Sequence, residues 1–172
     1  ICYSPNHSLT LPLMEVSDIK EVITRWQQEY TNLSSDPNIN HVQIFENKGA
    51  IMGCSNPHPH GQIWAQRSIP QEVQKKVVRQ KSHWDQNKKS LLGDYLQQEL
   101  DDKERIVLKN KSFVVLVPYW AVWPYELMIV PKRKMASILE LTEAEKVAYA
   151  NILKRTTIKF DNLFNVSFPY SA

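Results

Sequence analysis

The clearest periodic pattern of apolar residues in the chain lies between Ser17 and Leu33. An apolar side chain recurs there every three or four residues, which is the spacing that places side chains on one face of an α-helix. A hydroxyl residue followed by an acidic one is typical of a first helical turn, so we predict a helix over 17–33 with Ser17 as its N-cap. The predicted apolar face consists of Ile19, Val22, Ile23, Trp26, Tyr30 and Leu33.

A second long helix is predicted after Thr142, because Thr142 and Glu145 have the spacing of a capping box. The apolar side of this helix carries Tyr149, Ile152, Leu153, Thr156 and Phe160. A polar stretch from Pro70 to about Leu100 predicts further helix with interruptions. Its basic residues alternate with polar ones, which is typical of a solvated helix face; they are Lys75, Lys76, Arg79 and Lys81.

Strand composition marks four other stretches of the chain. Residues 1–5 read as the end of a strand, 41–47 alternate in polarity, 58–66 form the next strand, and 107–132 hold two apolar runs around a Trp-Pro corner. Turn-rich residues separate these stretches, notably the segment 34–40 and the pair Lys48-Gly49. The pattern therefore predicts an α+β fold, with an antiparallel sheet packed by helices.

Two ten-residue segments of the chain share one pattern of apolar, acidic and hydroxyl positions. They are LMEVSDIKEV at 13–22 and ILELTEAEKV at 138–147, and each precedes a predicted helix. Helix entrances resemble one another by chance, so an internal repeat and a coincidence are both open. A repeat would mean that the chain begins and ends partway through its two copies, and we therefore expect a piece of a longer protein.

Composition narrows the classes of protein. Hydrophobic residues make up 42% of the 172 residues, which is enough for a core, and no apolar run is long enough for a bilayer. A net charge of +3 is close to balance and does not by itself indicate nucleic-acid binding. The start of the chain lacks the features of a signal peptide, and two cysteines do not make a disulfide framework, so we expect a cytoplasmic protein.

The candidate chemistry lies in the segment His58-Pro59-His60-Gly61-Gln62. Side chains alternate along a strand, so His58, His60 and Gln62 are predicted to project from one face. Pro59 and Gly61 suit a strand edge that a ligand approaches closely. Two surface histidines beside a turn, or a partial metal site, would be the simpler interpretation. The array of two imidazoles and an amide favours a functional face.

A neutral imidazole is a good nucleophile toward phosphorus and can form a covalent nucleotidyl intermediate. A positioned amide such as that of Gln62 could stabilise charge on the phosphate oxygens. Gln62 cannot deliver a proton, so the face suits a leaving group that is stable as an anion, such as a sugar phosphate. No glycine-rich phosphate loop is present among the four glycines, so a nucleotide would be held by another device.

Four stretches resemble the signatures of the galactose-1-phosphate uridylyltransferase family, which belongs to the histidine-triad superfamily. They are FENKG (45–49), GCSNPHPHGQ (53–62), PYWAVWPYE (118–126) and FDNLFNVSFPYS (160–171), and the resemblance covers essentially the whole chain. The family contains two fused copies of a half-domain. The resemblance implies that residues 1–103 are the C-terminal part of the first histidine-triad-like half and residues 104–172 the N-terminal part of the second.

The resemblance also implies an activity. His60 matches the nucleophile of a uridylyl-histidine intermediate, and Gln62 matches the residue that binds the transferred phosphoryl group. The positions that match the surroundings of the nucleotide's phosphates and ribose are Phe45, Asn47, Gly53, Cys54 and Ser55. The implied reaction exchanges a uridylyl group between UDP-glucose and galactose 1-phosphate, giving UDP-galactose and glucose 1-phosphate. The implied partner is a second identical subunit, with no nucleic acid and no membrane.

The same resemblance implies a zinc ion and no organic cofactor. His58 and His7 match zinc ligands, although His7 taken alone would be a turn histidine. The family's Cys-x-x-Cys pair is missing here, so the two histidines are half of a tetrahedral site. A glutamate that binds a second metal in many members is replaced by Lys76, sixteen positions beyond His60, and that second site is not expected.

Two other functions are open from the sequence. A nucleotide hydrolase of the same superfamily is disfavoured by Gln62, which stands where a third histidine would be. A zinc-stabilised nucleotide-binding paralogue without catalysis is kept open by Lys76. Product analysis in labelled water distinguishes the hydrolase from a transferase, and a test for a stable uridylyl adduct distinguishes the non-catalytic paralogue from a transferase.

Overall fold

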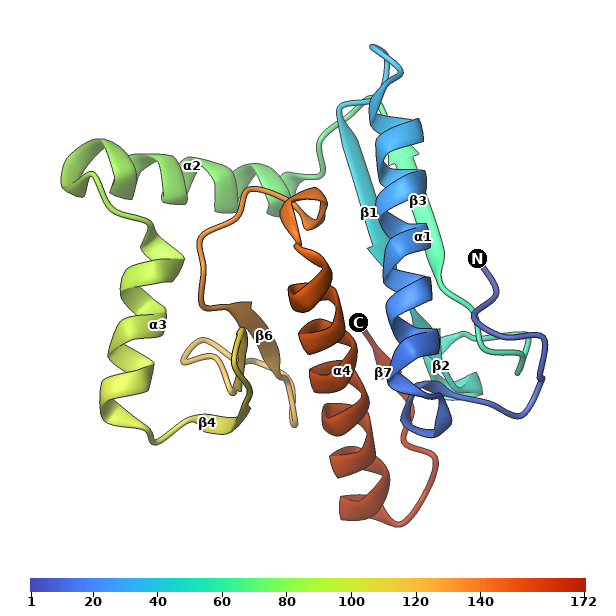
Figure 1. Ribbon diagram of the computed structural model, residues 1–172. Helices are drawn as coiled ribbons and strands as arrows, with labels where there is room; N and C mark the ends of the chain where they lie inside the picture. The colour runs from blue at the N-terminus through green and yellow to red at the C-terminus, as the bar shows by residue number, and fades with distance from the viewer. The chain divides into compact units, whose positions relative to one another are not determined.

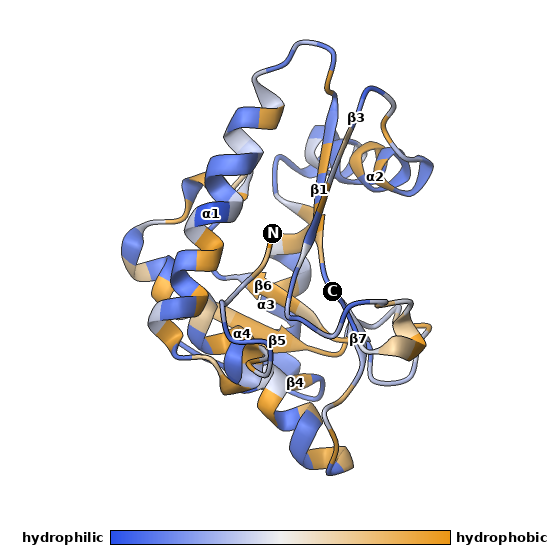
Figure 2. Cartoon of the chain, turned by 90° about the vertical axis from the view of Figure 1, so that its right-hand side faces the viewer, coloured by the Kyte–Doolittle hydropathy of each residue, from blue (hydrophilic) through white to orange (hydrophobic).

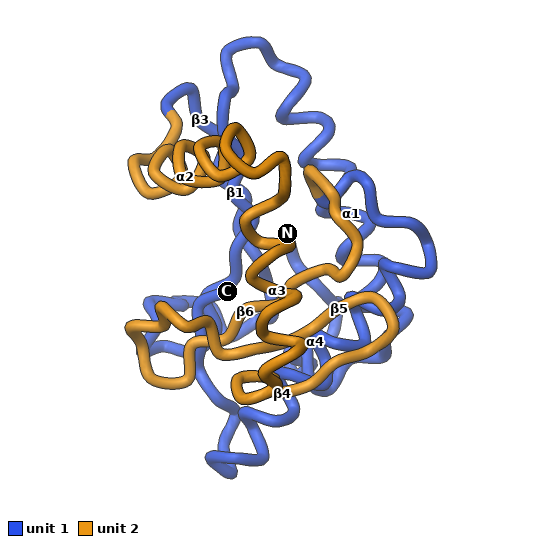
Figure 3. The backbone as a smooth tube through the Cα atoms, turned by 90° about the vertical axis from the view of Figure 1, so that its left-hand side faces the viewer, with its two compact units in different colours: residues 1–68, 138–172 blue, residues 69–137 orange.

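The computed structural model describes residues 1–172, and these form two compact units (Figure 3). Unit 1 combines residues 1–68 and 138–172, and unit 2 is the intervening segment 69–137. Helices and small antiparallel sheets occur in both units, which confirms the predicted α+β class. The helices are α1 (Val16–Ser34), α2 (Gln71–Asn87), α3 (Leu91–Asp102) and α4 (Glu143–Phe164), with short 3-10 turns η1 (Leu11–Leu13), η2 (Ala50–Met52) and η3 (Ile138–Glu140).

The core of unit 1 forms where α1 lies alongside α4 (Figure 1). Polar and apolar residues alternate around α1 (Figure 2), and the predicted face is confirmed: Ile19, Val22, Ile23 and Trp26 are buried. The prediction of Ser17 as N-cap is wrong, since α1 begins at Val16 and its N-cap is Glu15. Position 20 holds a lysine, so Ser17 has no acidic partner with which to form a capping box.

The capping box at the start of α4 is confirmed. Thr142 Oγ1 accepts a hydrogen bond from the Glu145 main chain at 3.2 Å, and Glu145 Oε2 accepts one from the Thr142 main chain at 3.0 Å. Ile152 and Thr156 of the predicted apolar face are buried. Lys146 is buried as well. Its ammonium donates to Thr24 Oγ1 of α1 at 3.3 Å and pairs with Glu143, and these contacts compensate for the burial of its charge.

The strands of unit 1 form two short antiparallel pairs. β1 (His41–Phe45) pairs with β3 (Gln62–Gln66), and β2 (Asn47–Lys48) pairs with β7 (Tyr170–Ser171). The predicted strand over 58–66 therefore begins later than expected, at Gln62. Residue 60 forms only an isolated bridge with residue 2, which brings the start of the chain beside the histidine segment.

Unit 2 holds α2, α3 and a three-stranded antiparallel sheet. Its strands are β4 (Ile106–Lys109), β5 (Phe113–Leu116) and β6 (Met128–Pro131). The core consists of Leu96 of α3 with Val114, Leu116 and Val130 of the sheet. Helix α2 confirms the predicted polar helical stretch, and its basic residues are exposed. No helix in either unit combines the length and the apolar composition needed to cross a bilayer.

The two similar ten-residue segments have similar local structure. Each passes through a 3-10 turn, η1 or η3, into a long helix, α1 or α4. Both helices belong to unit 1, whose two parts are separated in sequence by unit 2. The expected boundary between half-domains at 103/104 stays a prediction.

Candidate active site

The loop between β2 and β3 is shaped by two glycines and an asparagine. Gly49 and Gly53 have positive φ angles of 92° and 79°, which glycine adopts without strain. A Cβ at Gly49 would also lie 2.8 Å from Cβ of Pro169. Asn56 Oδ1 then accepts a hydrogen bond from the main-chain N–H of His58 at 3.0 Å, which makes a tight turn before the histidines.

The first residues of the chain run antiparallel to the histidine segment. The N–H of Tyr3 donates to the carbonyl of Pro59 at 2.9 Å, and the N–H of Gly61 donates to the carbonyl of Ile1 at 2.9 Å. The expected strand end at residues 1–5 is thus confined to the first three residues. These main-chain bonds fix the backbone on both sides of His60.

His60 has one ring nitrogen committed to the main chain. Its Nδ1 lies 2.7 Å from the carbonyl oxygen of His58. A carbonyl oxygen only accepts hydrogen bonds, so Nδ1 carries the hydrogen and, in the neutral ring, Nε2 carries the free lone pair. The acceptor that the sequence could not identify is therefore a backbone carbonyl two residues away. The ring is half-buried, and Nε2 is its uncommitted nitrogen.

Gln62 begins β3 directly opposite Phe45 of β1. Facing residues of an antiparallel pair share one side of the sheet, and Trp64 on the same side meets Phe45 edge-on, with ring centroids 5.2 Å apart. The Gln62 side chain makes no hydrogen bond within the chain, which leaves its amide available to a ligand. This surface therefore offers one amide beside two aromatic rings.

The predicted common face of His58, His60 and Gln62 is not a regular strand face. His58 lies in a bend, and its side chain turns to His7 instead. The Nδ1 atoms of the two rings are 2.8 Å apart, and the ring centroids are 4.5 Å apart. His58 thus has two separate contacts: its carbonyl orients His60, and its ring meets His7.

The His7 and His58 pair fits half of a zinc site. Two nitrogens bound to one tetrahedral zinc ion lie about 3.4 Å apart, so a small widening of this pair would accept the ion. No group of three or more His, Cys, Asp or Glu side chains gathers here, so the two ring nitrogens would make up only half of the ligand set of a tetrahedral zinc site.

A buried carboxyl group, Glu46, lies between Phe45 and Asn47 at the edge of this site. Its Oε2 accepts a hydrogen bond from the Tyr170 hydroxyl at 2.9 Å, and its side chain is 7% exposed. Burial raises the pKa of Glu46 to about 7, although the hydrogen bond from Tyr170 and the nearby Lys48 and His60 act in the opposite direction. Burial also raises the pKa of Tyr170, which keeps the phenol a donor.

The Glu46 carboxyl makes unfolding depend on pH. The folded pKa of about 7 exceeds the unfolded value of 4.5. Protonated Glu46 therefore contributes its full stabilisation below pH 4.5, and this contribution to the free energy of unfolding is lost as the pH rises through 7. The shift is equivalent to about 3 kcal/mol. We expect Glu46→Gln, which keeps an acceptor for Tyr170 but cannot ionise, to remove this slope.

Urea unfolding at pH 5 and pH 8 measures the effect. The variant should gain stability over the unsubstituted protein at pH 8 and match it more closely at pH 5. Glu29→Gln makes the same chemical change on α1 and should leave the slope unaltered. Parallel pH profiles for Glu46→Gln and the unsubstituted protein would contradict the assignment.

The other predicted ligand-binding residues lie in the loop after η2 and in the β2–β7 ladder of unit 1. Gly53, Cys54 and Ser55 follow η2 in the glycine-shaped loop, and the Cys54 thiol donates to the Asn56 carbonyl at 3.0 Å. Asn47 pairs with Ser171 in the β2–β7 ladder. Every predicted site residue therefore belongs to unit 1, whereas Lys76 lies on α2 of unit 2.

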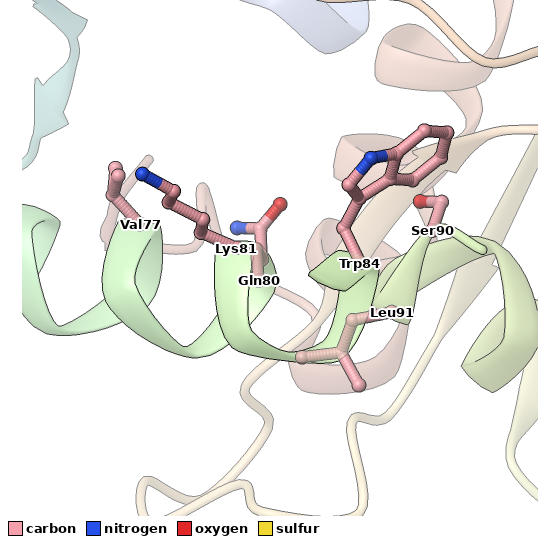
Figure 4. A pocket seen from close by; sticks show the side chains of 6 residues that line it. All are labelled: Val77, Gln80, Lys81, Trp84, Ser90 and Leu91. Atoms are coloured by element: carbon pink, nitrogen blue, oxygen red, sulfur yellow. The ribbon is translucent and has the colours of Figure 1, made fainter. Parts of the chain in front are cut away.

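Unit 2 has a shallow pocket of its own between α2 and the start of α3 (Figure 4). It contains none of the predicted site residues. Its lining side chains are Val77, Gln80, Lys81, Trp84, Ser90 and Leu91.

Comparison with known proteins supports the family resemblance. Residues 1–70 match the model of the N-terminal domain of galactose-1-phosphate uridyl transferase, and residues 71–172 match the model of its C-terminal domain. The chain belongs to this family. The family-model boundary at 70/71 coincides closely with the start of unit 2.

Relatives in the galactose-1-phosphate uridyl transferase family come from distant organisms. The chain is 47% identical to the galactose-1-phosphate uridylyltransferase of Saccharomyces cerevisiae and 48% identical to that of Haemophilus influenzae, in both cases over 99% of this chain and 48% of the relative. It therefore spans about half the length of the curated relatives it matches.

Solved structures show the same fold. A uridylyltransferase structure superposes with a TM-score of 0.93 at 26% identity, covering 99% of this chain and 54% of that one. An ADP-glucose phosphorylase from Arabidopsis thaliana, solved with bound ADP-glucose, superposes with a TM-score of 0.88 at 25% identity, covering 98% of this chain and 52% of that one.

The sequence analysis did not identify the residues that support the candidate site. Glu46, Tyr170 and Ser171 lie within the quoted motifs, yet none was singled out. One signal was available for Glu46: it continues the alternation of Val42 and Ile44, which places a carboxyl at a core-facing position. The partnership with residues 170 and 171 had no signal in the sequence.

Proposed function

We propose that this chain carries the nucleophile of a uridylyl transfer between UDP-glucose and galactose 1-phosphate. Nε2 of His60 attacks the α-phosphorus of UDP-glucose, an N–P bond forms, and the bond from that phosphorus to the bridging oxygen breaks. Glucose 1-phosphate leaves as an anion. An oxygen of the galactose 1-phosphate phosphate group then attacks the same phosphorus and breaks the N–P bond, which gives UDP-galactose.

The hydrogen bond from His60 Nδ1 to the His58 carbonyl is the observation that carries this proposal. It fixes the tautomer and the direction of Nε2 before a substrate arrives, so no reorganisation of the ring is needed during attack. An imidazole held in this way can form and then release a phosphoramidate, dividing the exchange into two displacements.

Other residues of the site have supporting roles in the proposal. The amide of Gln62 donates to a non-bridging oxygen of the transferred phosphoryl group, where negative charge increases during attack. Phe45, Asn47, Gly53, Cys54 and Ser55 surround the nucleotide's phosphates and ribose. Hydrolysis is disfavoured because the amide of Gln62 cannot take a proton from water.

Isolation of the covalent intermediate tests this function. The full-length protein, incubated with UDP-glucose labelled at the α-phosphate and no sugar phosphate, should retain about one label per active site, with release of glucose 1-phosphate. Peptide mapping should place the label on His60, and galactose 1-phosphate should remove it as UDP-galactose. Label on another residue, or release of free UMP instead of UDP-galactose, would contradict the proposal.

We also propose that His7 and His58 hold a structural zinc ion together with two ligands from outside these residues. Zinc at such a closed site contributes to folding and leaves no open coordination position for substrate. The converging Nδ1 atoms support this assignment. A His58 ring held by the ion would keep the His58 carbonyl directed at Nδ1 of His60.

Zinc content tests the metal proposal. Elemental analysis of the full-length protein should find one ion per subunit, and His7→Ala should remove it and lower Tm. The 172-residue segment alone should hold zinc weakly or not at all. One ion per molecule of that segment would show that its own residues complete the site.

Two further features belong to the proposal. The family resemblance supports a homodimer, which sedimentation of the full-length protein would test. Two free thiols, Cys2 and Cys54, support a cytoplasmic location, which cell fractionation would test.

A further inference from the structure

The short β2–β7 ladder brings two polar side chains of distant residues face to face. Glu46 and Ala172 exchange both main-chain hydrogen bonds, at 2.8 and 2.9 Å. The next pair along an antiparallel ladder is of the non-hydrogen-bonded kind, in which side chains lie closer together. That pair is Asn47 and Ser171, and the Ser171 hydroxyl donates to Asn47 Oδ1 at 2.7 Å.

This contact lies on the open side of β2. Side chains alternate along a strand, and the neighbours of Asn47 on the other side, Glu46 and Lys48, are 7% and 9% exposed. Asn47 and Ser171 face away from that buried pair. With Oδ1 engaged by Ser171, both hydrogens of Asn47 Nδ2 have no partner within the chain and are available to a ligand.

We propose that Ser171 is a positioning residue of the nucleotide site. By holding Asn47 Oδ1, it directs the Asn47 amide N–H groups toward the phosphate or ribose oxygens of the bound uridine nucleotide. The inference rests on the proposed function, because it takes Asn47 as a nucleotide-binding residue.

The chemistry of the amide explains why such a residue is needed. A primary amide can turn by 180° about its last bond, which exchanges a donor group for an acceptor. An unheld Asn47 would spend part of its time with Oδ1 toward the phosphate oxygens, where it repels them. A hydroxyl fixed opposite Oδ1 removes that orientation before the nucleotide binds.

The strand pairing itself does not depend on the Ser171 hydroxyl. Main-chain bonds at residue 172, the hydrogen bond from Tyr170 to Glu46, and the close approach of Pro169 to Gly49 hold this segment in place. Removal of the hydroxyl should therefore change the orientation of Asn47 and leave the position of β7 unchanged. That separation makes the proposal testable.

The experiment uses the full-length protein with Ser171→Ala, Ser171→Thr and the matched control Ser167→Ala, an exposed serine of the same segment. Ser171→Ala should weaken UDP-glucose binding, measured as a dissociation constant in the His60→Ala background, by about three- to tenfold. Its Tm should equal that of the unsubstituted protein. Ser171→Thr, which keeps a hydroxyl, should restore most of the affinity, and Ser167→Ala should have no effect.

A double substitution separates positioning from a general structural role. In a background with Asn47→Ala, the change Ser171→Ala should have no further effect on affinity, because its only route to the nucleotide is gone. An equal loss in both backgrounds, or a lowered Tm for Ser171→Ala alone, would overturn the proposal. So would an unchanged dissociation constant for Ser171→Ala in the His60→Ala background, once the unsubstituted protein has been shown to form the labelled His60 adduct. Failure of the unsubstituted protein to form that adduct would instead refute the proposed function.

Discussion

Replacement of His60 by alanine is expected to abolish uridylyl exchange. Both half-reactions pass through the bond between Nε2 and phosphorus, so loss of the nucleophile should lower the exchange rate by at least about 10⁴-fold. Affinity for UDP-glucose should survive within a few-fold, because the amides and the glycine-shaped loop remain. Steady-state exchange assays and equilibrium titration with UDP-glucose measure the two quantities.

The matched control is His41→Ala. His41 lies in the same β1–β3 sheet at the opposite end from Gln62, where it pairs with Gln66. This substitution should leave exchange and adduct formation close to those of the unsubstituted protein. Retention of full exchange activity by His60→Ala would end the assignment of His60 as nucleophile.

Substitution of Gly61 by alanine is expected to damage both stability and activity. A Cβ at this position would overlap the Tyr3 hydroxyl oxygen and lie 3.1 Å from Tyr3 Cζ. Tyr3 is 7% exposed, and its main chain is bonded to Pro59, so it cannot move aside freely. We expect a loss of about 1–3 kcal/mol in the free energy of unfolding. Displacement of the adjacent His60 should lower the rate of adduct formation by about 100-fold.

A second substitution tests the cause. The Tyr3 hydroxyl is buried without a hydrogen-bond partner, so Tyr3→Phe alone should leave stability unchanged or raise it, because it removes an unpaired polar group from the interior. Combined with Gly61→Ala, it removes the severest overlap and should recover part of the lost stability and rate. The free energy of unfolding and the rate of adduct formation are measured for the unsubstituted protein, the two single variants and the double variant. Equal damage in the presence and absence of the Tyr3 hydroxyl would show that the clash is not the cause.

Local patterns in the sequence predicted the helices well, because their signals are local. The apolar face of α1 and the capping box of α4 depend on residues three or four positions apart. The predicted N-cap, Ser17, lies two residues after the observed one, Glu15. Glu15 makes no side-chain capping bond, so the sequence does not mark it as the helix start. The histidine segment was assigned to a strand too early, although Asn56 before Pro57 was a turn signal that should have weighed against it.

The sequence points to candidate site residues, and it does not point to the residues that support them in the fold. His60, Gln62 and the glycine-shaped loop are contiguous in sequence, so a motif could identify them. The residues that hold the site come from both ends of the chain: Tyr3 beside Gly61, and Tyr170 and Ser171 beside Glu46 and Asn47. Pairing of a two-residue strand across such a separation carries no periodic signal, so only the folded chain reveals it.

The pairing of β2 with β7 can form only late during synthesis on the ribosome. The Asn47 and Ser171 contact spans 124 residues, and all of unit 2 is made in between. At ordinary translation rates, β2 waits on the order of ten seconds before its partner exists. During that interval the hydrogen-bonding edge of β2 is open to other chains, while unit 2 can already close its sheet from neighbouring residues. Slow codons between β2 and β7 would lengthen this exposure and raise the demand for chaperones, with no change in the amino-acid sequence.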